Sequence, residues 1–134
     1  MVTETPQSFS VVVPCHMERM DEVTPLLEGL CAGADDHAVD QILTAFNEAF
    51  VNVVKHSQLT EEQTLEVEAH RDNSKVVVKL IDTGVPFNYT PGVLEPPLLS
   101  ESGMGLFIIQ SYMSDVTYET AERNVLTMTR QLNE

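Results

Sequence analysis

The strongest constraint on the fold is a run of apolar residues spaced as they are on one side of an α-helix. Between Asp35 and His56 these residues recur every three or four positions: Val39, Ile42, Leu43, Phe46, Phe50, Val53 and Val54. The spacing predicts a helix that starts at Asp35 or Asp36 and ends at about His56. A helix with one apolar stripe has to bury that stripe against another element.

The other elements follow from alternating and continuous apolar patterns. Strands are predicted over 8–13, 64–70, 75–81, 115–120 and 124–132, and further helices over 17–30 and 103–112. Within 17–30, Thr24 resembles an N-cap and Pro25 the first helical residue. The order of elements predicts an α+β fold: a two-layer sandwich of one mixed, mostly antiparallel sheet with helices packed on one face.

Charge narrows the classes of partner. The 134 residues suit a single domain, which we expect to span 1–134, and they include 7 Lys and Arg against 21 Asp and Glu, a net charge of −14. Direct binding to nucleic acid or to an anionic membrane draws on basic residues, so neither is expected. Basic proteins, or anions whose charge a metal offsets, are the partners that this charge favours.

The cysteine count and the length of the apolar runs indicate the cellular compartment. The chain opens on a polar stretch, and no apolar run reaches the roughly 20 residues that span a bilayer. Cys15 and Cys31 are too few for a disulfide framework. We therefore expect a cytoplasmic protein with both thiols reduced.

Three polar residues interrupt the long helix at a spacing of four. Glu48, Asn52 and His56 share one face of it. A carboxylate that can act as a base, beside an amide oxygen that can ligate a hard cation, suits metal-assisted chemistry on a phosphate. The alternative is a solvated face, with His56 favoured by the negative end of the helix dipole.

Two glycine-containing segments are further candidates for a ligand site. Asp82 ends a buried strand and Gly84 follows two residues later, which suits a ligand edge or an ordinary turn. Gly103 and Gly105 precede an apolar helix start, which suits a phosphate cradle or a tightly packed turn. The chain contains neither a P-loop nor the dinucleotide fingerprint.

Taken in order, three segments resemble the nucleotide-binding fold shared by gyrase-type ATPases and histidine kinases. Residues 46–56 resemble its N-box, 81–87 its adenine-binding box, and 102–116 its second glycine box with the following helix. Within that superfamily the chain is similar to the anti-sigma factor serine-protein kinases of bacteria. The resemblance covers nearly the whole chain and implies the histidine-kinase-like ATPase fold.

The resemblance implies roles for the candidate residues, with ATP and Mg²⁺ as cofactors. Glu48 would be the general base, accepting a proton from a protein serine hydroxyl or from water. Asn52 would hold Mg²⁺ against the phosphates, and Asp82 would accept the adenine amine, with Gly84 allowing close approach. Residues 88–102 would form the nucleotide lid. The remaining nucleotide-binding positions would be Lys55, His56, Gly103, Met104, Gly105, Leu106 and Asn124.

The implied function is that of an ATP-binding anti-sigma regulator. Members of this family phosphorylate a serine of an antagonist protein, sequester a sigma factor and act as homodimers. The chain departs from the pattern of this family in charge at two places. Glu101 stands where a basic residue is common, and 88–102 contains no Lys or Arg. A third departure is Asn124, where many relatives carry threonine.

These departures keep two other interpretations open. One is a non-catalytic regulatory binding module of the same fold, with nucleotide as a conformational ligand or not bound. The other is a stand-alone histidine-kinase-like ATPase domain, which ranks last because no phosphoacceptor helix is evident.

Overall fold

The computed structural model describes residues 7–57, 59–60, 62–86 and 101–132, with the backbone alone over 101–106. The predicted lid therefore lies almost wholly outside the described residues. In chain order the elements are β1 (Ser8–Pro14), a short 3-10 helix (Met17–Arg19), α1 (Met20–Leu30), α2 (Asp36–His56), β2 (Thr64–Arg71), β3 (Lys75–Asp82), α3 (Glu101–Tyr112), β4 (Asp115–Thr120) and β5 (Asn124–Gln131). This order is the predicted one.

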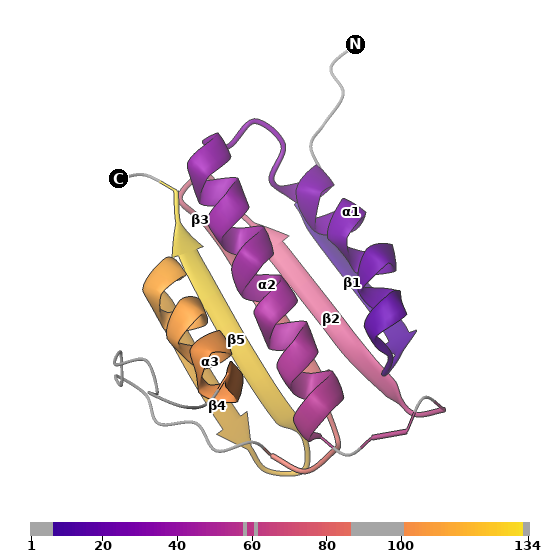
Figure 1. Cartoon of the computed structure of the whole chain (residues 1–134). Coiled ribbons are helices and arrows are strands. Elements are labelled where there is room, and N and C mark those ends of the chain that lie inside the picture. The colour runs from indigo at the N-terminus through magenta and orange to yellow at the C-terminus, as the bar shows by residue number, and fades with distance from the viewer. Residues whose placement is uncertain (1–6, 58, 61, 87–100, 133–134) are drawn as a thin grey trace.

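The strands form one five-stranded sheet in the order β1-β2-β3-β5-β4, and the three α-helices cover one face of it (Figure 1). The predicted two-layer α+β sandwich is therefore confirmed. The expectation of a mixed sheet is wrong, because all four pairings are antiparallel. The physical reason is the position of β5: β3 and β4 point the same way, but β5 lies between them and runs against both.

The core lies between the sheet and α2, which crosses the middle of the helical layer (Figure 1). Asp35 caps the helix by accepting a hydrogen bond from the backbone N–H of Ala38 at 3.1 Å, as the sequence predicts. Phe46 and Phe50 are fully buried, with ring centroids 5.8 Å apart. The predicted apolar stripe therefore anchors α2 on the sheet.

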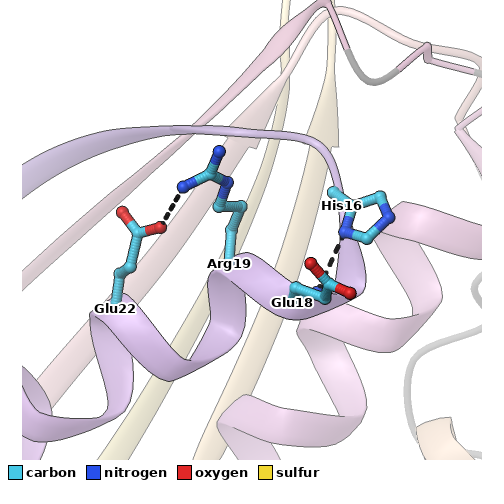
Figure 2. A network of polar contacts seen from close by, with 4 residues as sticks. All are labelled: His16, Glu18, Arg19 and Glu22. Atoms are coloured by element: carbon cyan, nitrogen blue, oxygen red, sulfur yellow. Dashed lines mark hydrogen bonds and ion pairs between the residues drawn. The ribbon is translucent and has the colours of Figure 1, made fainter.

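The chain enters α1 through a capped turn. The Nδ1 atom of His16 accepts a hydrogen bond from the backbone N–H of Glu18 at 3.1 Å, which caps the 3-10 helix. Arg19 pairs with Glu22 one turn later (Figure 2). The Arg19–Glu22 ion pair is exposed and contributes little to stability. The His16 cap satisfies a backbone N–H where the 3-10 helix begins.

The prediction that Thr24 and Pro25 start this helix is wrong, because Pro25 lies inside α1. The Thr24 hydroxyl donates to the carbonyl of Met20 at 3.0 Å and so bonds within the helix instead of capping it. Val23 and Leu27 are fully buried on the two sides of the proline. Their packing on the sheet outweighs the local preference of proline for a helix start.

No helix in the described part of the chain is long and apolar enough to cross a bilayer. Cys15 and Cys31 are free and buried, as expected from the cysteine count.

The sheet face turned away from the helices carries a pair of acidic side chains on β2. The hydrogen bond with Glu68 raises the pKa of Glu66, burial adds to the rise, and the nearby Arg123 opposes it. The Arg123 guanidinium lies 3.9 Å from the Glu66 carboxylate. A raised carboxyl pKa means that the folded state binds the proton more tightly than the unfolded chain does.

We therefore predict that this pair costs stability at neutral pH. The proton on Glu66 stabilises the folded state below the ordinary glutamate pKa of 4.5. This stabilisation is lost as pH rises through the raised pKa of Glu66. Glu68→Gln should raise the free energy of unfolding at pH 7, by less than about 1 kcal/mol because the pair faces solvent. The gain should shrink at pH 4.

Urea unfolding at the two pH values measures this effect. Glu122→Gln on the exposed β4–β5 turn is the control for the loss of one negative charge. An equal gain in both variants at pH 7 would contradict the assignment to the Glu66–Glu68 pair.

Candidate functional site

The candidate site has one part on α2 and one at the end of β3. Glu48, Asn52 and His56 follow one another at about 6 Å along one face of α2, given a rise of about 1.5 Å per residue. Glu48 and His56 are half-buried, whereas Asn52 is only 5% exposed. The middle residue of the three is therefore not part of a solvated face.

The side-chain amide of Asn52 is incompletely satisfied. Its Nδ2 atom is buried and has no hydrogen-bond partner among the described residues. A buried donor without a partner costs about 1–3 kcal/mol. Because an amide can be turned over with little change of shape, either its nitrogen or its oxygen can face this position. Asn52 is thus available to a ligand.

The donor chemistry of this position fits Mg²⁺. An amide oxygen is a hard ligand, and Mg²⁺ usually takes few ligands from the protein and several from substrate phosphates and water. The described residues contain no group of three His, Cys, Asp or Glu side chains that would hold a metal by themselves. The arrangement therefore suits a cation that arrives with a phosphate ligand.

At the end of β3, Asp82 forms a closed network with its neighbours. Its Oδ1 atom accepts hydrogen bonds from the backbone N–H of Gly84 at 2.8 Å and from Nδ2 of Asn124 at 2.9 Å. The same Nδ2 donates to the carbonyl of Gly84 at 2.8 Å. Asp82 and Asn124 are cross-strand partners at the end of β3, and both side chains are buried. The network therefore lies on the face of the sheet that the helices cover.

The two parts of the site meet where Gly84 touches the end of α2. The backbone N–H of Val85 donates to the carbonyl of Ser57 at 2.7 Å. A Cβ atom on Gly84 would lie 2.4 Å from that carbonyl oxygen and 2.6 Å from the Ser57 Cβ. Glycine is therefore required by the backbone of Ser57. The sequence signal for this contact was the glycine itself, but its partner could not be read from the sequence.

Cys15 lies beside this junction, with its sulfur 4.0 Å from the Ser57 hydroxyl. Burial raises the pKa of the Cys15 thiol, the Ser57 hydroxyl lowers it, and the charge of Asp82 raises it. The net shift is upward from 9.0, so the thiol is protonated at neutral pH and is a poor nucleophile. Cys15 packs at the site without adding reactive chemistry to it.

The remaining predicted positions lie at the ends of the helices. Lys55 is exposed and His56 half-buried in the last turn of α2, where positive charge is favourable. Gly103, Met104, Gly105 and Leu106 lie in the first half of α3, which packs against α2.

In the described residues helix α3 runs over Glu101–Tyr112, so it includes the predicted residues from Gly103 onward and two residues before them.

A separate hollow reaches Asp82 from the opposite face of the sheet. It has a volume of about 330 Å³ and is lined among others by Val12, Glu66, Ile81 and Arg123. Strand alternation turns Asp82 toward the helices, together with Leu80 and away from Ile81. The hollow is therefore distinct from the Asn52–Asp82 site.

Comparison with known proteins is consistent with this geometry. Residues 13–130 match the histidine kinase-like ATPase domain. The serine-protein kinase RsbW of Listeria innocua is 31% identical over 114 residues, which cover 77% of this chain and 72% of the relative. The protein of the same name from Staphylococcus aureus strain RF122 is 28% identical over 135 residues, covering 90% and 84%. The chain therefore belongs to the histidine kinase-like ATPase family, in its serine-protein kinase branch.

Solved structures show the same fold at lower identity. The structure of the RsbU and RsbW domains of Rv1364c from Mycobacterium tuberculosis superposes with a TM-score of 0.71 at 19% identity, over 95% of this chain. The chain spans only 33% of that longer protein. The histidine kinase AdeS of Acinetobacter baumannii gives a TM-score of 0.55 at 12% identity, covering 94% of this chain and 68% of AdeS.

The junction of Gly84 and Ser57 generates a prediction with a matched control. Gly84→Ala should lower the free energy of unfolding by about 1–3 kcal/mol, because its new methyl group meets backbone atoms that cannot move alone. Gly29→Ala in α1 places the same methyl in open space and should raise stability by about 0.5–1 kcal/mol. Denaturant unfolding of both variants measures the difference. Equal stability of the two would show that Ser57 does not constrain position 84.

Proposed function

We propose that this chain is a cytoplasmic ATP-binding anti-sigma regulator that phosphorylates a serine of an antagonist protein and sequesters a sigma factor. Family membership supports nucleotide binding, and the names of the relatives support serine-protein kinase activity. The observation that carries the proposal is the buried amide of Asn52, one helical turn from Glu48, whose Nδ2 has no hydrogen-bond partner in the described part of the chain. It provides a ligand position beside a base.

In this proposal the α2 residues divide the chemistry. Phosphoryl transfer depends mainly on positioning and on neutralising charge. Asn52 would hold Mg²⁺, which when bound supplies the positive charge that balances the phosphates. Glu48, on the same face and half-buried, would take the proton from the attacking serine hydroxyl or water. Asp82 would accept the amine of adenine at the far end of the nucleotide.

The charge of the chain supports both the cation and the class of partner. At −14 the protein repels ATP that carries no cation, so Mg²⁺ has a larger effect on binding here than in a neutral protein. A sigma factor with a basic DNA-binding surface is complementary to such an acidic chain. The antagonist protein would be the phosphoryl acceptor, and a homodimer would be the assembly.

A non-catalytic binding module of the same fold is the second candidate. Glu101 and the absence of Lys and Arg over 88–102 favour it, because no basic side chain of that segment would steady the terminal phosphate. The intact Glu48, Asn52 and Asp82 set favours the kinase.

The two candidates differ in the effect of Glu48→Gln. This change keeps the shape of the side chain and removes the base, so phosphoryl transfer should fall at least about 100-fold. The dissociation constant for ATP with Mg²⁺ should change less than about twofold, since Glu48 is assigned no contact with the bound nucleotide. ADP formation, with water or the antagonist protein as acceptor, measures the first quantity and calorimetric titration the second.

Glu28→Gln on the exposed face of α1 is the charge-matched control and should leave both quantities unchanged. Wild-type protein that binds ATP but forms no ADP would favour the non-catalytic module. Full transfer in Glu48→Gln would exclude Glu48 as the base.

A further inference from the structure

Asn124 is tied to the end of β3 by both of its amide protons. Its Nδ2 atom donates to Oδ1 of Asp82 at 2.9 Å and to the carbonyl of Gly84 at 2.8 Å. Both partners are acceptors, so the group between them has to be the NH₂ of the amide and not its oxygen. The orientation of Asn124 is thus set by its neighbours.

These bonds also divide the two oxygens of the Asp82 carboxylate. Oδ1 accepts from Gly84 and from Asn124, and no described residue donates to Oδ2. The side chain is 5% exposed, so the network holds it in one orientation. One oxygen is used by the protein, and the other remains available to accept a hydrogen bond from a ligand.

The consequence is that the Asp82–Asn124 pair offers a ligand an acceptor oxygen but no spare donor of its own. Adenine presents an amine donor at its six-position, whereas guanine presents an oxygen acceptor there. An Asn124 free to rotate could offer its NH₂ to the guanine oxygen. With both protons held by Asp82 and Gly84, that compensation is lost, and the guanine oxygen would face a carboxylate oxygen.

We propose that Asn124 is a positioning residue that sets the preference for adenine over guanine by orienting Asp82. This inference rests on the proposed function, because it concerns the base of the nucleotide bound there. It also changes the role expected for Asn124: the residue acts through Asp82 and does not itself donate to the base.

The test compares ATP and GTP, each with Mg²⁺, by calorimetric titration of the full chain. The wild type should bind ATP more tightly than GTP. Asn124→Leu keeps the size of the side chain but removes both protons, and should weaken ATP about tenfold, the lower range for losing a hydrogen bond to a charged group. Affinity for GTP should not fall, so the ratio of the two affinities should drop about tenfold.

Thr127→Val is the control on the same strand, with its side chain on the open face of the sheet, and should keep the wild-type ratio. If Asn124→Leu does not fold, Asn124→Thr replaces it. One hydroxyl proton can bind Asp82 or Gly84 but not both, so its ratio should lie between those of the wild type and the leucine variant.

The outcomes separate this inference from the proposed function. A parallel loss of ATP and GTP affinity would show a merely structural role and overturn the inference while leaving nucleotide binding intact. Equal affinity of the wild type for ATP and GTP would overturn it as well. A wild-type chain that binds neither nucleotide would overturn the proposed function, and this inference with it.

Discussion

The close approach of Gly84 to Ser57 is the contact on which the candidate site depends. It joins the end of α2, which carries Asn52, to the end of β3, which carries Asp82, through one backbone hydrogen bond of 2.7 Å and a space that excludes a Cβ atom. α2 is otherwise fixed by its apolar stripe on the sheet. The two polar ends are therefore positioned by the same packing that forms the core.

The site keeps buried polar groups that a purely structural junction would not need. Asp82 and Asn124 satisfy one another, whereas the Asn52 amide is left without a described partner at a cost of about 1–3 kcal/mol. A protein can retain such a group where a ligand completes it, and family membership indicates that the ligand is a nucleotide. The net charge of −14 disfavours binding of a nucleotide anion that carries no cation.

Periodicity was sufficient to predict the order of elements and the bounds of α2 from Asp36 to His56, because its stripe is long and its cap local. Periodicity failed at Pro25, where the packing of buried neighbours outweighs the preference of proline for the first turn of a helix. It also failed for the direction of strand pairing, which depends on the position of β5 between β3 and β4. For the site, Asn52 and Asp82 were found as motif residues. The bonds of Asn124 and the contact of Ser57 with Gly84 were not, since both join segments distant in sequence.

Thermal unfolding of the wild-type chain with ATP, ADP or GTP, each with and without Mg²⁺, tests the central claim most directly. A ligand at 100 times its dissociation constant adds about 2.7 kcal/mol of stability. For a chain of this size the midpoint should rise by roughly 3–6 °C. The account predicts that rise for ATP and ADP when Mg²⁺ is present, with little for GTP. An unchanged midpoint with every nucleotide would contradict a nucleotide site between Asn52 and Asp82.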